Sequence, residues 1–150
     1  ETPATDGRFI YAYFGQVGVV CLDMEGNIRW TKDLGTYATA NEWGTGSSPI
    51  TDGHLVYLQC DNNDSSFLVA LDAETGDEKW RIPRDEKTNW STPFLWRHEK
   101  GTELVTSGRS KARSYDPSSG QLIWELGGMS TIVVPTPIAG KDFLFVSSGY

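Results

Sequence analysis

The residues best equipped for chemistry lie in two polar segments that also carry aromatic side chains. Residues 84–91, RDEKTNWS, place charged, amide and indole groups in one short stretch, and residues 36–48, TYATANEWGTGSS, add a phenol and a second indole. Such groups can bind a polar ligand by hydrogen bonding and stacking. The candidate binding residues are Tyr37, Asn41, Glu42, Trp43, Arg84, Asp85, Glu86, Asn89 and Trp90.

A simpler interpretation of both segments needs no ligand. Connecting segments usually run over the surface and are polar because water solvates them. On this view each segment is a solvated loop whose tryptophan packs against a neighbouring element. The sequence leaves both interpretations open.

Residue types associated with metal, redox or nucleophilic chemistry are sparse and scattered. Cys21 and Cys60 lie 39 positions apart without a CxxC motif, which excludes the usual zinc and redox spacings. We interpret them as small buried side chains, although a disulfide between them stays open. His54 and His98 have no partner at metal-ligand spacing, and DNNDSS (61–66) lacks the order of a calcium loop. We therefore predict no catalytic residue and no metal site, and no cofactor is evident.

The chain repeats a pattern of four residue types along its whole length. Prolines at positions 3, 49, 93 and 137 are separated by 46, 44 and 44 residues. Each of the first three is followed by a small residue, an aspartate, a glycine and a tryptophan in the same order. These landmarks are Cys21, Asp23, Gly26 and Trp30, then Ala70, Asp72, Gly76 and Trp80, then Ser114, Asp116, Gly120 and Trp124.

Each repeat contains the signals of four short strands. In the second repeat, SPI begins the first strand, and strands follow at 54–60, 66–73 and 78–82. The corresponding second strands elsewhere are 8–15, 102–108 and 142–149, and they are apolar on both faces, as in sheets packed between other sheets. No segment has sustained helical periodicity, so we expect almost no helix.

Four antiparallel strands in about 44 residues are typical of one blade of a β-propeller. The sequence therefore predicts an all-β fold of three blades and the start of a fourth. The predicted blades comprise residues 1–46, 47–90, 91–134 and, in part, 135–150. Closed propellers have about four to eight blades, so we expect this chain to be a fragment that packs against further blades of the same polypeptide.

The repeated residues have structural duties in this prediction. The aspartate can accept backbone N–H bonds in an Asx-type turn, and the glycine suits a position with positive φ. The tryptophan lies on the outer strand, where its ring can pack between neighbouring blades. The small residue leaves room for that indole. A motif that recurs in every blade is expected to build the architecture and not to hold one cofactor.

The segment ALDAETGDEKW resembles the tryptophan-docking motif AxDxxTGxxxW of the pyrroloquinoline-quinone-like (PQQ-like) propeller family. The match lies at Ala70, Asp72, Thr75, Gly76 and Trp80, while CLDMEGNIRW is one residue shorter and SYDPSSGQLIW carries serine at the first position. The family includes quinoprotein dehydrogenases and BamB-type envelope lipoproteins. The resemblance covers the whole chain and implies a location in the periplasm, the cell envelope or outside the cell.

Two functions follow from this resemblance. The first is a non-catalytic module that binds protein partners or acts as a scaffold in the bacterial cell envelope. The second is part of an alcohol or sugar dehydrogenase that uses PQQ and Ca²⁺. In that group an adjacent cysteine pair covers the quinone, and Glu, Asn and Asp side chains bind the calcium. No such set can be mapped onto this sequence, which favours the first function.

Charge and hydropathy exclude other classes of partner. The formal net charge is −7, which repels nucleic-acid phosphates and anionic lipid surfaces. No apolar run approaches the roughly 20 residues that a membrane-spanning helix needs. We therefore expect a protein partner, with neither nucleic-acid binding nor membrane insertion by this segment.

Overall fold

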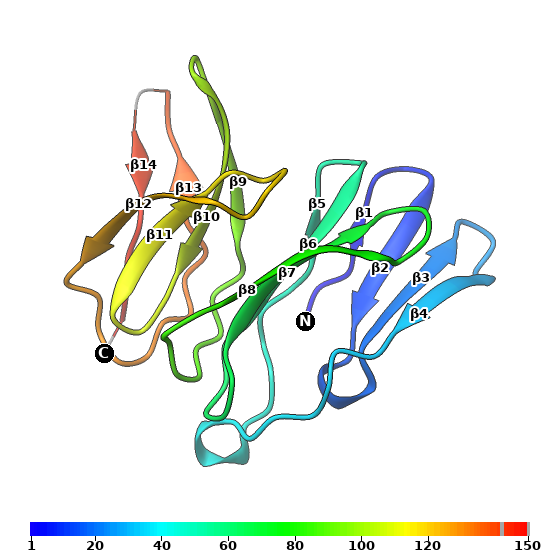
Figure 1. Cartoon of the computed structure of the whole chain (residues 1–150), viewed down its shortest axis with the longest axis horizontal. Coiled ribbons are helices and arrows are strands. Elements are labelled where there is room, and N and C mark those ends of the chain that lie inside the picture. Colours follow the sequence, from blue (N-terminus) through cyan, green and yellow to red (C-terminus); the bar gives the residue numbers. More distant parts are fainter. Residues whose placement is uncertain (142, 150) are drawn as a thin grey trace.

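The computed structural model describes residues 1–141 and 143–149 and is built almost entirely of antiparallel strands. Three sheets have four strands each and a further sheet has two (Figure 1). The first sheet holds β1 (Ala4–Thr5), β2 (Phe9–Tyr13), β3 (Val19–Asp23) and β4 (Ile28–Lys32). The second holds β5 (Ile50–Thr51), β6 (Leu55–Cys60), β7 (Phe67–Asp72) and β8 (Glu78–Pro83).

The third sheet holds β9 (Phe94–His98), β10 (Gly101–Ser107), β11 (Lys111–Tyr115) and β12 (Leu122–Gly127). The two-stranded sheet pairs β13 (Ile138–Ala139) with β14 (Leu144–Phe145). The only helical pieces among the described residues are two single 3₁₀ turns, η1 (Gly15–Val17) and η2 (Ala40–Glu42). Neither is long or apolar enough to cross a bilayer. The prediction of an all-β fold with four-stranded sheets is confirmed.

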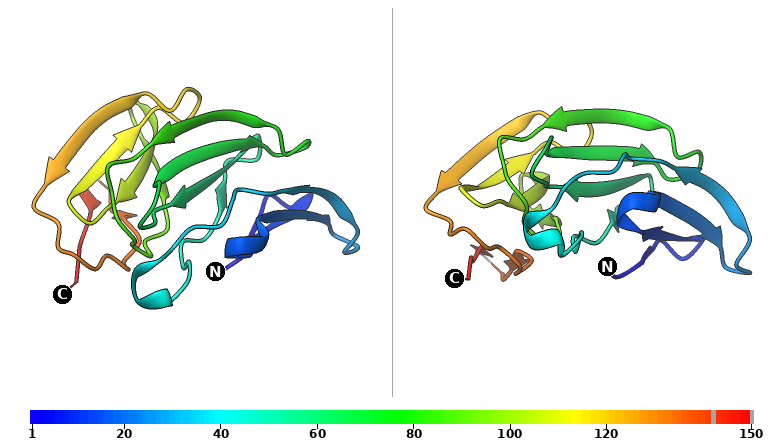
Figure 2. Two further views of the ribbon diagram at one scale, coloured as in Figure 1. Left: turned by 60° about the horizontal axis from the view of Figure 1, so that its bottom comes forward. Right: turned by 90° about the horizontal axis from the view of Figure 1, so that it is seen from below.

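The sheets stand side by side in an arc, each with its strands in sequence order (Figure 2). The last strands β4, β8 and β12 lie along the outer side of the arc, and the first strands lie on its inner side. The connections alternate between two ends of the sheets. We call the end that carries η1 and η2, at the bottom of Figure 1, the loop end, and the opposite end the turn end.

The middle strands supply the core, as their apolar sequences predict. In the second sheet, five consecutive residues of β6 and five of β7 are buried, so both faces of these strands are covered. One buried cluster fills the space between the first and second sheets, and another fills the space between the second and third. Burial of apolar surface between sheets therefore provides the main attraction along the arc.

Some strand bounds differ from the prediction. The second strand of the first repeat was expected over 8–15, but β2 ends at Tyr13 because Gly15 enters η1 with a φ of +45°. The expected strand at 142–149 begins outside the described residues, and β14 covers only Leu144–Phe145. The strand expected over 66–73 is shorter at both ends, because Ser66 and Ala73 bond to loops and turns.

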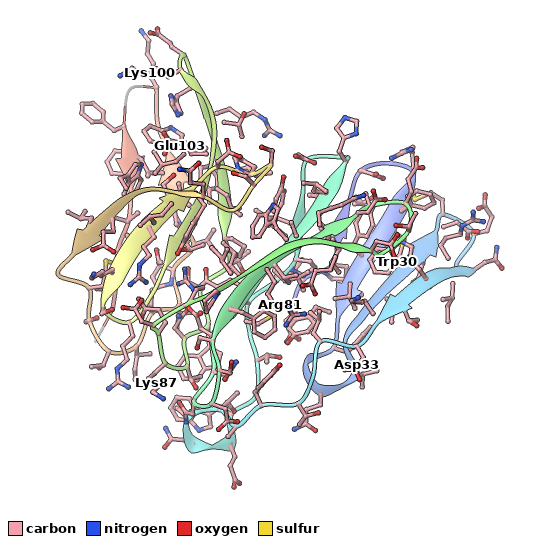
Figure 3. The ribbon with its side chains drawn as sticks, in the orientation of Figure 1. Trp30, Asp33, Arg81, Lys87, Lys100 and Glu103 are labelled. Carbon is pink, nitrogen blue, oxygen red and sulfur yellow. The ribbon has the colours of Figure 1, made fainter. Side chains whose placement is uncertain are left out.

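The repeated tryptophan joins each sheet to the next. Trp30 of β4 lies against the turn between β7 and β8, and its Nε1 donates to the carbonyl oxygen of Ala73 at 3.1 Å (Figure 3). Trp80 of β8 repeats the contact one sheet later, donating to the carbonyl oxygen of Pro117 at 2.9 Å. Each indole also packs against a tyrosine of its own sheet, at 6.1 Å between ring centroids in both.

The glycine of the next repeat receives this indole. A Cβ on Gly76 would lie 2.7 Å from Trp30, and a Cβ on Gly120 would lie 2.8 Å from Trp80. Both glycines have positive φ, at +76° and +72°. The predicted positive φ is confirmed, and the close approach of the ring is a second reason for glycine that the sequence did not reveal.

Gly76→Ala is expected to lower the free energy of unfolding more than Gly26→Ala does. Both positions have positive φ, at +76° and +88°, but a Cβ at position 26 meets no atom within 4 Å. Both variants therefore have backbone strain. Only Gly76→Ala also has a clash with Trp30, which should add about 1–3 kcal/mol to its loss of stability. Denaturant titration measures both variants, and equal losses would show that Trp30 does not restrict the turn.

Candidate functional site

The aspartates of the repeat are fully engaged in their turns. Oδ1 of Asp72 accepts the backbone N–H groups of Glu74 and Thr75 at 2.9 and 3.1 Å, and Asp23 and Asp116 make equivalent bonds. The pKa of Asp72 lies below its ordinary value. The main cause is the hydrogen bond from the Lys79 ammonium, and the two backbone N–H groups have a smaller effect in the same direction. A carboxylate held ionised by local donors builds a turn and is a poor general acid.

The small residue of each repeat lies directly opposite the tryptophan across the sheet. Cys21 pairs with Trp30, Ala70 with Trp80, and Ser114 with Trp124. The register shifts immediately after each pair, so the outer strand carries one extra residue at the same place in every sheet. A β-bulge increases the local twist and redirects side chains. This shared irregularity helps to aim Trp30 and Trp80 at the next sheet.

Trp124 differs from its two counterparts. Its Nε1 donates to Oε2 of Glu103 at 2.7 Å, within its own sheet. Glu103 also accepts from the Ser114 hydroxyl at 2.5 Å and contacts Nε2 of His98 at 3.1 Å. Trp30 and Trp80 each pack against a tyrosine of their own sheet. In the third sheet the equivalent register position is occupied by Val105. His98 thus has a structural partner.

Segment 84–91 is not the open polar surface that the sequence suggested. The prediction that Arg84, Glu86 and Asn89 lie on a binding face is wrong, because they are only 6%, 5% and 4% exposed. Asp85 alone of the candidate charges in this segment projects outward, with a side chain 77% exposed. The solvated-loop interpretation holds in part, because Asp85 and Lys87 are exposed and Trp90 packs on a neighbouring loop. Folding turns this segment inward, between the second and third sheets.

A buried ion pair explains this burial. The Arg84 guanidinium contacts Asp61 through two bonds, Nε to Oδ1 at 2.8 Å and Nη2 to Oδ2 at 3.1 Å, with both side chains fully buried. Its Nη1 donates to the hydroxyls of Thr106 at 2.8 Å and Tyr115 at 3.0 Å. Burial alone would lower the pKa of Arg84, but the Asp61 charge raises it above its usual range. Arg84 therefore joins the second sheet to the third.

Two further contacts complete this network. Oδ2 of Asp61 accepts from Nε2 of Gln59 at 2.9 Å and from the amide of Asn89. A second arginine, Arg113 of β11, contacts Glu86 at 2.6 Å and Asp85 at 2.5 Å. Sequence reasoning missed Gln59, Asp61 and Arg113. The one available signal was an arginine in the middle of a strand, since such a residue is seldom buried without a partner.

Segment 36–48 remains exposed where the sequence suggested it. Asn41, Glu42 and Trp43 are exposed, with Trp43 at 63%, and Tyr37 is half-buried against Phe67 at 5.6 Å between ring centroids. Trp43 packs on Trp90, the last candidate residue, at 5.5 Å. The two segments therefore meet at the loop end. Segment 36–48 is exposed there, and segment 84–91 supports it through Trp90.

This exposed segment borders a hollow whose two walls are both formed by described residues. A cavity of about 740 Å³ lies between η1 and the loop that carries η2. Its lining includes Phe14, Gln16, Tyr37, Thr39, Glu42 and Thr45. This volume falls in the usual range for small-ligand sites. We take the cavity and its rim as the candidate functional site.

The backbone of this loop is held in an uncommon conformation. Asn41 and Glu42 have φ values of +54° and +57°, in the left-handed region that residues other than glycine seldom occupy. Hydrogen bonds from Glu42 N to Thr39 O and from Trp43 N to Ala40 O, both at 3.2 Å, close the turn. The backbone N–H of Gly44 donates to Oγ1 of Thr39 at 3.0 Å. Strain of this kind is often found where a side chain must be presented in one direction.

The cysteines have neither the position nor the ionisation of reactive groups. Both are free and buried, one in β3 and the other at the end of β6. Burial raises the pKa of Cys21 to about 11 and that of Cys60 to about 12. At neutral pH both remain thiols, so neither supplies the thiolate that nucleophilic chemistry needs.

The four-stranded sheets and their repeated indole contacts define part of a β-propeller. The family model of the outer membrane protein assembly factor BamB matches residues 1–150, and the chain belongs to this family of PQQ-like repeat proteins. BamB from Moraxella catarrhalis has a similar fold, with a TM-score of 0.74 and 16% identity over 98% of this chain and 46% of that one. This chain thus spans about half the length of that protein.

Enzymes share the fold as well. Quinohemoprotein alcohol dehydrogenase from Comamonas testosteroni gives a TM-score of 0.66 and 20% identity over 85% of this chain and 21% of that one. A europium-containing methanol dehydrogenase gives a TM-score of 0.63 and 17% identity over 85% of this chain and 24% of that one. Comparison with curated proteins gave no match. At these identities the structural likeness establishes the fold alone.

The donor groups of this chain do not fit the quinone and metal of such dehydrogenases. The cysteines lie on different sheets and form no adjacent pair. Within residues 1–141 and 143–149, no three His, Cys, Asp or Glu side chains are grouped so that they could hold a metal ion. Asp61 and Glu86 are already bonded to arginines. We therefore derive no chemical step through these groups.

Arg84→Met is expected to destabilise the protein by about 3–5 kcal/mol, because Asp61 would keep a buried charge without its partner. Arg29→Met removes an exposed arginine of β4 and should change the free energy of unfolding by about 0.5 kcal/mol or less. Urea titration compares the two. Adding Asp61→Leu to Arg84→Met should recover part of the loss, and a further loss of the full size would contradict the pairing.

Proposed function

We propose that this chain is a non-catalytic β-propeller module that binds a protein partner or acts as a scaffold in the bacterial cell envelope. The observation that carries the proposal is the match of all 150 residues to the family model of an outer membrane protein assembly factor. A periplasmic or other envelope location is part of the proposal and rests on the same match.

The distribution of polar groups supports this function. The aspartates of the repeats bond to their own turns, and the buried charges of the loop end bond to one another. These groups stabilise the sheets and leave few free side chains for catalysis. The surface exposed at the loop end includes three large apolar side chains, Phe14, Val17 and Trp43, among polar ones. Exposed aromatic side chains are enriched at protein interfaces.

A dehydrogenase is the second candidate, because two quinoprotein enzymes share the fold over 85% of this chain. We place it second because the cysteines and carboxylates described above do not form a site for the quinone and Ca²⁺. Such a site could include residues of other blades, and an assay on the full-length protein addresses that.

The full-length protein is incubated with PQQ and Ca²⁺ and is supplied with primary alcohols or aldose sugars. It is expected to reduce an artificial electron acceptor no faster than the quinone does without the protein. A known quinoprotein dehydrogenase treated in parallel controls for active cofactor. Saturable turnover that requires both PQQ and Ca²⁺ would overturn the non-catalytic proposal.

A photoreactive phenylalanine analogue at position 43 is expected to cross-link a defined envelope protein in living cells. The matched control carries the analogue at position 24 on the turn end, because Met24 and Trp43 have similar exposure, 57% and 63%. Mass spectrometry of the adduct identifies the partner. Equal adducts from both positions, or none from position 43, would contradict a partner surface at the loop end.

A further inference from the structure

The cavity at the loop end has acidic and aromatic walls. Glu1 and Glu42 are among its lining residues, and no Lys, Arg or His of the described chain is among them. Phe14 and Tyr37 contribute rings to the same lining. Carboxylates and aromatic faces both attract a cation, the first by charge and the second through the ring quadrupole.

The backbone at Glu42 is held in place by the loop that carries it. Its φ of +57° follows a φ of +54° at Asn41, and the turn is closed by the hydrogen bonds to Thr39 and Ala40 described above. The next residue, Trp43, rests on Trp90, whose Nε1 donates to the carbonyl oxygen of Gly44 at 3.0 Å. A loop whose backbone is already ordered loses little backbone freedom when it binds, which favours recognition.

The apolar rim extends beyond the cavity. Phe14, just before η1, is 57% exposed, Val17 of η1 is 72% exposed, and Trp43 is exposed on the facing loop. A small amine would fill the hollow and leave these side chains in water. A polypeptide segment could place a cationic side chain inside and cover the rim with its neighbours.

The loop that forms this site stands outside the repeat. Trp30 and Pro49 are 19 positions apart, whereas the corresponding distances in the next two repeats are 13 and 13. The additional residues include η2, which has no counterpart after the second or third sheet among the described residues. Part of this longer connection packs on Trp90, and Asn41, Glu42 and Trp43 remain exposed.

We propose that this cavity receives a lysine or arginine side chain from an extended segment of the protein partner. The inference rests on the proposed function and adds the chemistry of the partner. The cation enters between Glu42 and the rings of Phe14 and Tyr37, and the apolar part of the segment lies against Phe14, Val17 and Trp43.

Fluorescence anisotropy with labelled synthetic peptides tests the proposal on the full-length protein. A peptide that alternates lysine with leucine is expected to bind saturably, and more weakly as salt rises, because exposed charges are screened. The same peptide with glutamate in place of lysine should not bind. Equal binding of the two peptides, or no binding of the lysine peptide, would overturn the proposal.

Glu42→Lys provides the decisive variant, with Glu25→Lys on the turn end as its matched control. Both raise the net charge by two, and both side chains are exposed, so general attraction to a basic peptide falls equally. Glu42→Lys should weaken binding roughly tenfold beyond the control, since an attractive pair becomes a repulsive one. Equal weakening by the two variants would contradict the site.

A second variant separates binding from folding. Phe14→Ala removes an exposed ring and is expected to weaken the lysine peptide several-fold, while thermal unfolding of both variants should stay close to that of the parent protein. If the peptides fail but position 43 still cross-links a partner, this inference is wrong and the proposed function stands. If the cross-link is lost as well, both are wrong.

Discussion

The contact on which the structure depends is the insertion of two outer-strand indoles, Trp30 and Trp80, beneath the turn of the next sheet. Trp30 and Trp80 bury their rings against Gly76 and Gly120, and each donates its N–H to a main-chain carbonyl. The ring supplies apolar area, and the hydrogen bond fixes the distance between sheets. Because each contact links consecutive sheets, their stabilities are coupled along the arc, as in other repeat proteins.

The loop end is joined by a different force. Arg84 and Asp61 carry charge into the protein interior, and only the surrounding hydroxyl and amide groups make that favourable. A buried pair with so many partners has one acceptable geometry, so it sets the relative position of the second and third sheets. It also removes from the surface the very residues whose chemistry looked most useful in the sequence.

The proposed function rests on parts of the chain that neither force uses. The loop that carries η2 is the longest connection between sheets within the described residues, and it presents Glu42 and Trp43 beside a cavity. The second repeat supports this loop, because Trp90 packs on Trp43 and donates its indole N–H to the carbonyl oxygen of Gly44. Membership of the BamB family and the acidic, aromatic character of this surface both favour recognition of a protein over chemical conversion of a small molecule.

The sequence by itself determined the all-β class, the four-stranded repeat and the turns around Asp23, Asp72 and Asp116, because these depend on local conformational preferences and on spacing along the chain. Only the tertiary structure decided which polar residues are available. Arg84 and Glu42 look equally exposed in the sequence. Arg84 is buried in an ion pair with Asp61, 23 positions away, whereas Glu42 is exposed. Partners so distant in sequence leave no local pattern, so burial of charge had to be seen in the folded chain.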